Sequence, residues 1–167
     1  GVRNTHRTAL APTKSTSLLM GGVSESVFPD PGMVFDAGSA VGELRRITPE
    51  LYKLMNERGV YNKETVDDIV EHVGSVQHVE WLDEHEKQVF LTAFEIPQTV
   101  LLRYASQRQK HLCQGQSLNF FVPEGGSEKE ISDLMTMVVL DENILSQYYI
   151  YSRSGVVVKD ECIACQA

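Results

Sequence analysis

The sequence lacks the features that mark several large classes of protein. Only 15 of its 167 residues are Lys or Arg, against 23 acidic residues, so the net charge is −8. No basic stripe is long enough to neutralise a phosphate backbone, and nucleic acid is not an expected partner. The longest apolar runs, such as Met137–Leu140, fall far short of the roughly 20 residues that cross a bilayer. With no signal peptide visible, we expect a cytoplasmic protein without a membrane partner.

Cysteine is also scarce, and an odd number of three does not suggest a structural disulfide framework. Cys162 and Cys165 form a Cys-x-x-Cys pair near the end of the sequence. A structural zinc site needs about four ligands, and no second pair completes one. A thioredoxin-type motif would follow a strand at a helix start. The remaining interpretation is a redox-active dithiol on a mobile tail, residues 156–167, that exchanges with a disulfide elsewhere. Cys113 is expected to be a small buried residue within a helix.

The histidines are scattered, and none forms the i, i+4 pair with a central Glu that is typical of a hydrolytic zinc helix. The acidic stretch Glu80–Glu86 is interpreted as a solvated helix start. The sequence therefore predicts no metal site in this chain.

What the chain does have is a regular series of helix signals, with capping residues at the starts and glycines at several ends. The predicted helices span residues 49–58, 63–73, 83–94, 97–112 and 128–145. Predicted strands span residues 4–11 and 147–153, and a hairpin pairs 33–35 with 43–47 across Ala37–Ala40. Strands need neighbours to satisfy their backbone groups. A helix-rich α/β piece with a strand near each end therefore indicates that its missing strands belong to another chain.

A hydroxyl-rich turn precedes the apolar run Leu18–Met20; it consists of Pro12, Thr13, Lys14, Ser15, Thr16 and Ser17. Short hydroxyl side chains cap the free amides at a helix start. The same amides, the helix dipole and a lysine also suit a phosphate group. Local sequence alone favours the cap, which is the commoner use, and leaves the phosphate site as the alternative.

Tyr148 and Tyr149 are adjacent phenols in the last predicted strand. Aromatic residues are common in strands, so periodicity alone favours a structural role. Neighbouring side chains of a regular strand face opposite sides. A shared path for electrons and protons through both rings would therefore require a local irregularity.

Several motifs occur in one order along the chain: Arg3-Asn4, Ala9–Ser17, Glu25–Pro29, Gly74–Gln77, Gln114–Asn119, Tyr148-Tyr149 with Ser152-Arg153, and the final Cys-x-x-Cys. Each motif is weak alone, but the ordered set resembles the large subunit of class I ribonucleotide reductase. The resemblance covers essentially the whole chain and only the C-terminal part of that subunit.

The resemblance implies the C-terminal portion of a ten-stranded α/β barrel, residues 1–155, completed by a partner fragment. It implies that Pro12–Ser17 grips the substrate diphosphate. Tyr148 and Tyr149 match the pair that passes a radical from the small subunit to a barrel cysteine. Cys162 and Cys165 match the tail pair that re-reduces the active-site disulfide.

The implied partners are the N-terminal fragment of the large subunit, a small subunit whose metal-containing site supplies the radical, a ribonucleotide, and thioredoxin or glutaredoxin as reductant. No cofactor is expected on this chain itself. The barrel cysteines of the family should lie upstream, so we expect one fragment of a divided subunit, inactive alone. Two alternatives are a noncatalytic assembly module derived from the large subunit and a stand-alone thiol carrier.

Overall fold

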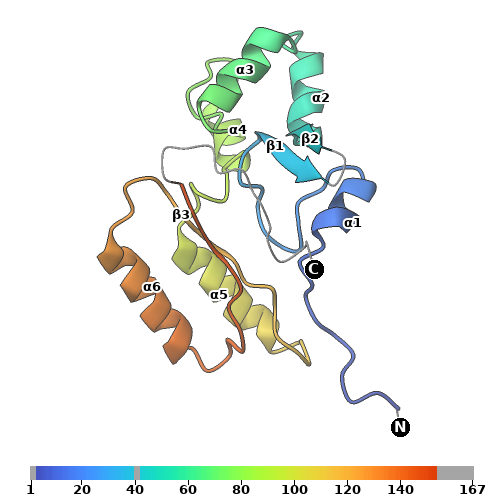
Figure 1. Cartoon of the computed structure of the whole chain (residues 1–167). Helices are drawn as coiled ribbons and strands as arrows, with labels where there is room; N and C mark the ends of the chain where they lie inside the picture. Colours follow the sequence, from blue (N-terminus) through green and yellow to red (C-terminus); the bar gives the residue numbers. More distant parts are fainter. Residues whose placement is uncertain (1–2, 40–41, 154–167) are drawn as a thin grey trace.

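The described part of the chain contains more helix than strand, and its short strands form two separate pairs (Figure 1). The computed structural model describes residues 3–39 and 42–153. The helices are α1 (Lys14–Leu19), α2 (Pro49–Glu57), α3 (Lys63–Glu71), α4 (Glu84–Val89), α5 (Gln98–Gln109) and α6 (Glu128–Leu140). The strands are β1 (Val34–Ser39), β2 (Gly42–Ile47), β3 (Phe120–Val122) and β4 (Ile150–Ser152). In this part of the chain no helix has both the length and the apolar character of a bilayer span.

The predicted helix starts are confirmed where a side chain caps the helix. The side chain of Asn62 accepts a hydrogen bond from the Thr65 amide at 2.9 Å, and α3 begins at the next residue. Asp83 begins α4 and Ser127 begins α6, each in a reciprocal capping box with the Glu three residues on. Local side-chain chemistry therefore fixes these three starts.

The five predicted helices end one to five residues earlier than predicted; α5 ends at Gln109 and not at Leu112, and the two largest differences are at α4 and α6. Helix α4 ends at Val89, five residues before Phe94, because the next amides bond elsewhere: the Thr92 amide donates to the Glu95 carboxylate and the Ala93 amide to the Asp30 carbonyl, both at 2.8 Å. Helix α6 ends at Leu140 and not at Leu145. There the extended Asp141 accepts hydrogen bonds from the Asn143 amide at 2.9 Å and from the Ser106 hydroxyl at 3.0 Å.

The hairpin is antiparallel, with Val34 opposite Ile47 and Ser39 opposite Gly42. The turn predicted across Ala37–Ala40 is wrong, since residues up to Ser39 belong to β1. An ion pair of 2.9 Å between Arg45 and Asp36 lies across the two strands and fits this longer register.

Three stretches of backbone run parallel to one another. Strand β3 pairs with β4, and α6 provides the crossover that a parallel pair requires. Upstream of β3, Leu10 forms an isolated parallel bridge with Gln116. The predicted strand 4–11 is thus reduced to one bridge, and the predicted strand 147–153 to Ile150–Ser152. Strand β3 was not predicted, because its three buried apolar residues show no alternation.

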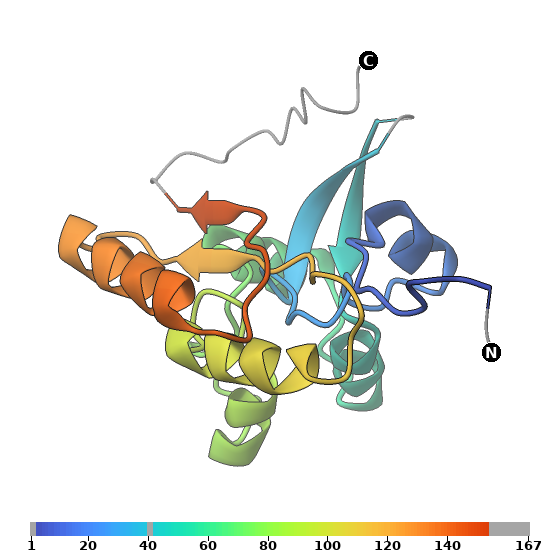
Figure 2. The ribbon, with the colours of Figure 1, turned by 90° about the horizontal axis from the view of Figure 1, so that it is seen from below.

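The buried residues form two cores. The first core lies among α5, α6 and β3, which appear side by side with β4 in Figure 2, and includes Leu102, Phe120 and Leu134. The second core lies among β1, α2, α3 and the segment that follows, and includes Leu51 and Ile69. The backbone of Gly74, at φ +79°, approaches β1 so closely that a Cβ atom would lie 2.6 Å from the Val34 carbonyl oxygen.

Candidate functional site

Tyr148 and Tyr149 lie directly before β4, where the backbone is not a regular strand. Their ring centroids are 4.0 Å apart with planes inclined by 50°. The rings are therefore in contact, although the side chains are neighbours in sequence. The rings are also partly open to solvent, with exposed fractions of 50% for Tyr148 and 37% for Tyr149. The irregularity that a shared path requires is present.

The tyrosine pair continues into a row of aromatic rings. Tyr149 lies 5.7 Å from Tyr151, and Tyr151 stacks on Phe121 at 5.3 Å with planes 20° apart. Phe121 meets the edge of Phe94 at 5.3 Å, and the Arg153 guanidinium lies 4.1 Å from the Phe94 ring centre. The row anchors the exposed pair to the buried first core. The sequence analysis did not single out Tyr151. Its spacing of two residues from Tyr149 could have indicated it, because residues two apart in a strand lie on the same side.

The segment Pro12–Ser17, called the turn below, consists of two residues that precede α1 and the first four residues of that helix, and α1 lacks the predicted side-chain cap. Thr13 has a left-handed backbone with φ 53°, and its side chain makes no capping hydrogen bond to the helix. Its hydroxyl instead accepts a hydrogen bond from the Ser26 amide at 2.8 Å. Ser17 is buried and donates to the Lys14 carbonyl at 2.8 Å, whereas residues 12–16 are exposed. The N-cap interpretation is therefore wrong in its main hydrogen bond, and the first residues of α1 are exposed.

The turn begins α1, which lies apart from β3 in Figure 1, whereas the tyrosine pair precedes β4, the partner strand of β3. The segment after α1 is held to the hairpin by Arg46, which donates to the carbonyls of Gly22 at 2.8 Å and Val23 at 3.1 Å. The tyrosine pair lies against the chain that enters β3. Within the described residues, the turn and the tyrosine pair do not line one common cavity.

The predicted tail pair, Cys162 and Cys165, and the predicted tail 156–167 lie outside the described residues. Cys113 is exposed and follows α5, so its predicted burial within a helix is wrong. Helix α5 ends at Gln109, and a turn separates it from Cys113. Hydrogen bonds from the Thr8 side chain and the neighbouring backbone lower the pKa of the Cys113 thiol.

Asp68, His72 and His78 come together at the end of α3 with one potential ligand atom each, all within 4.8 Å. Nε2 of His78 lies 2.8 Å from the Asp68 carboxylate, and the two imidazole rings stack at 3.6 Å with planes 18° apart. A metal ion lies near the plane of each imidazole that binds it, so one ring would have to turn to share an ion. The cluster was not predicted: Asp68 and His72 are four residues apart in sequence, but His78 lies ten residues from Asp68 across a turn.

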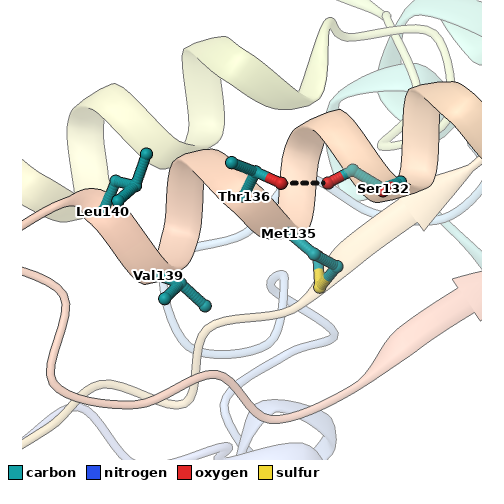
Figure 3. A pocket seen from close by; sticks show the side chains of 5 residues that line it. All are labelled: Ser132, Met135, Thr136, Val139 and Leu140. Carbon is teal, nitrogen blue, oxygen red and sulfur yellow. Dashed lines mark hydrogen bonds between the residues drawn. The ribbon is translucent and has the colours of Figure 1, made fainter.

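Two hollows lie along α6. One, of about 480 Å³, is bordered by the start of α5, by β3 and by the first turns of α6. The other, of about 300 Å³, lies on a single face of α6 and is lined by Ser132, Met135, Thr136, Val139 and Leu140 (Figure 3). The lining of the second hollow carries no charged or strongly nucleophilic group. Neither hollow includes the turn or the tyrosine pair among its lining residues.

Comparison with known proteins defines the family. The family model described as ribonucleotide reductase, barrel domain, matches residues 1–141. The chain is 36% identical over 178 aligned positions to a frog virus 3 protein named for the large subunit of ribonucleoside-diphosphate reductase, covering 99% of this chain and 31% of that protein. It is 32% identical to the ribonucleoside-diphosphate reductase subunit alpha of Chlamydia muridarum, covering 95% of this chain and 15% of that subunit.

A solved structure agrees. The class Id ribonucleotide reductase alpha subunit of Actinobacillus ureae superposes with a TM-score of 0.78 at 36% identity, covering 92% of this chain and 28% of that one. The fold is thus a part of an α/β barrel. The chain belongs to the ribonucleotide reductase family and corresponds to the C-terminal part of the large subunit. It spans about a third or less of the length of these relatives.

Proposed function

We propose that this chain is the part of a ribonucleotide reductase catalytic subunit that supplies the tyrosine radical relay, the substrate phosphate turn and the tail dithiol. The reaction is the reduction of ribonucleotides, with diphosphates as the expected substrates, to deoxyribonucleotides. The name ribonucleoside-diphosphate reductase, shared by the viral and chlamydial relatives, supports this substrate class.

The contact of the Tyr148 and Tyr149 rings at 4.0 Å is the observation that carries the proposal. A phenol that loses an electron and a proton together becomes a neutral tyrosyl radical, and it regains a hydrogen atom from its neighbour on the path. The radical of the small subunit removes a hydrogen atom from one tyrosine. The second tyrosine restores that atom and is itself restored by a cysteine thiol of the barrel. The resulting thiyl removes the 3′ hydrogen of the ribose.

The turn Pro12–Ser17 supports a phosphate site through its exposure. Thr13, Lys14, Ser15 and Thr16 are exposed at the start of α1, and Thr13 has a left-handed backbone. Backbone amides and hydroxyls at such a position donate hydrogen bonds to phosphate oxygens. In this proposal the remaining wall of the site comes from the upstream part of the barrel.

The dithiol of Cys162 and Cys165 completes the cycle. Barrel thiols give two electrons and two protons to the ribose, whose 2′-hydroxyl leaves as water, and the thiols become a disulfide. A thiolate of the tail pair attacks that disulfide, the second tail thiol resolves the mixed disulfide, and thioredoxin or glutaredoxin reduces the tail in turn. That the upstream barrel is a separate polypeptide stays a prediction, as does activity only with that partner and a small subunit.

A reconstitution assay tests the proposal. This chain, a polypeptide carrying the upstream barrel, and a small subunit are mixed with ribonucleoside diphosphates and thioredoxin. Deoxyribonucleotides should form only in the complete mixture, and the double variant Cys162→Ser/Cys165→Ser should stop after the first turnovers. A complete mixture that assembles without any nucleotide reduction would favour the noncatalytic assembly module.

A further inference from the structure

The motif Gln114–Asn119 has no role in the proposed chemistry, yet its side chains hold the segment that carries the tyrosines. Asn119 is buried, with 9% of its surface exposed, directly before β3. Its side-chain oxygen Oδ1 accepts a hydrogen bond of 3.2 Å from the backbone amide of Tyr149. A buried side chain that takes up a backbone amide of the partner segment replaces a hydrogen bond of the strand ladder.

The hydrogen bonds of the residues on either side of Asn119 show why the Tyr149 amide needs a side-chain acceptor. In a regular parallel ladder one residue would both donate to the Leu118 carbonyl and accept from the Phe120 amide. Here Tyr148 donates to Leu118 at 2.8 Å, and Tyr149 accepts from Phe120 at 3.0 Å. The tyrosine segment therefore contains one extra residue, as in a β-bulge, and the Tyr149 amide is left out of the ladder. Asn119 provides its acceptor.

The extra residue has a direct effect on the side chains. Alternation along a regular strand would send the two rings to opposite faces of the sheet. The bulge breaks that alternation, and the rings meet at 4.0 Å.

We propose that Asn119 is a positioning residue for radical transfer: its Oδ1 atom stabilises the bulge that brings Tyr148 and Tyr149 into ring contact. This inference rests on the proposed radical relay. Asn119 does not exchange electrons or protons with the tyrosines, and it acts through the backbone of Tyr149 alone.

Gln116 of the same motif holds the residues that precede the bulge. Its Nε2 atom donates to the Ala105 carbonyl at 2.7 Å and to Gln109 at 3.0 Å, which ties the motif to α5. Its own carbonyl accepts a hydrogen bond of 3.0 Å from the Ser146 hydroxyl, two residues before Tyr148. The tyrosine segment is therefore held from α5 through the motif, independently of the bound substrate.

The test compares three variants in the reconstituted reductase, with the upstream barrel and a small subunit present. Asn119→Leu keeps the size and removes the acceptor, whereas Asn119→Asp keeps both the size and an acceptor oxygen. The matched control is Gln98→Leu, because Gln98 likewise accepts a β3 backbone amide, that of Phe121 at 2.7 Å. Turnover and KM for a ribonucleoside diphosphate are measured for each, after the assembled complex has been isolated.

We expect kcat of Asn119→Leu to fall about tenfold to hundredfold at an unchanged KM, as for a small misplacement of a reacting group. Asn119→Asp should retain most of the activity, and Gln98→Leu should keep its kcat. Full turnover by Asn119→Leu, or equal loss in Asn119→Leu and Asn119→Asp, would overturn the inference. If Asn119→Leu does not assemble, Asn119→Ala adds no atoms and must show the same pattern. A wild-type mixture without turnover, or a fully active Tyr148→Phe, would instead overturn the radical relay itself.

Discussion

The tyrosine segment and the hydroxyl turn are held in different ways. Tyr148 and Tyr149 have backbone hydrogen bonds to Leu118, Asn119 and Phe120, and their rings continue into the buried first core. Residues 12–16 of the turn are exposed, and a hydrogen bond to the Ser26 amide holds Thr13.

This difference separates two kinds of site. The distance between the two tyrosine rings is set by neighbours within this chain, so it exists before any substrate arrives. The turn is exposed at residues 12–16, and in the proposal its phosphate site is completed by the upstream part of the barrel. Substitutions in the first region should therefore change kcat, and those in the second should change KM.

The largest effect is expected from Tyr148→Phe. The substitution keeps the ring and its packing but removes the hydroxyl hydrogen that the relay moves, so turnover should be abolished while substrate binding stays nearly intact. Nucleotide reduction and equilibrium binding of a ribonucleoside diphosphate are measured on the same reconstituted complex. Turnover at the wild-type rate would show that the radical takes another path.

A smaller effect is expected in the turn. Ser15→Ala and Thr16→Ala each remove a hydroxyl donor to a charged phosphate, which should raise KM by about tenfold and leave kcat nearly unchanged. The control is Thr5→Ala, which removes an exposed hydroxyl outside the turn. If kcat falls and KM stays constant in the turn variants, the residues act in the chemical step and not in binding.

Phe121→Leu tests whether the aromatic packing next to the tyrosine pair contributes to turnover. It removes the ring that stacks on Tyr151, which should lower the stability of the chain by about 1 kcal/mol and kcat by severalfold. Phe90→Leu is the matched control, since Phe90 is a buried ring of the second core. Denaturant unfolding and turnover are measured together. Equal losses of kcat in both variants would mean that the aromatic row has no specific part in the relay.

The smallest effect concerns Cys113. Because the hydrogen bond from the Thr8 side chain is the first cause that lowers the pKa of this thiol, Thr8→Val should raise that pKa and reduce the thiolate fraction at neutral pH. Alkylation by iodoacetamide at pH 7 should slow severalfold in a background of Cys162→Ser and Cys165→Ser. An unchanged rate would mean that Thr8 does not affect the thiolate.

Local sequence predicted those parts of the fold that local chemistry determines. Asn62, Asp83 and Ser127 begin helices because each side chain caps amides within three residues. The ends of α4 and α6 could not be predicted in this way, because Asp30 and Ser106, which lie far away in sequence, bond the residues that follow. Strand β3 is too short and too uniformly buried to show a period.

The candidate site shows the same division. The adjacent tyrosines could be found in the sequence, and the need for an irregular backbone followed from strand alternation. The cause of that irregularity could not be found, because Asn119 lies 30 residues before Tyr149 and meets it only through the parallel pairing of β3 and β4. A hydroxyl of the turn was expected to cap the helix, but the hydroxyl of Thr13, the residue before α1, accepts a hydrogen bond from the Ser26 amide, which only the folded chain brings near.

The radical relay is tested most directly by placing 3-aminotyrosine at position 148 or 149 of the reconstituted complex. Aminotyrosine gives up a hydrogen atom more easily than tyrosine, so a radical that reaches it is trapped there and is visible by electron paramagnetic resonance. The account predicts an aminotyrosyl signal at each position that appears only with the small subunit and a bound ribonucleotide. An intact small-subunit radical with no aminotyrosyl signal at either position would contradict it.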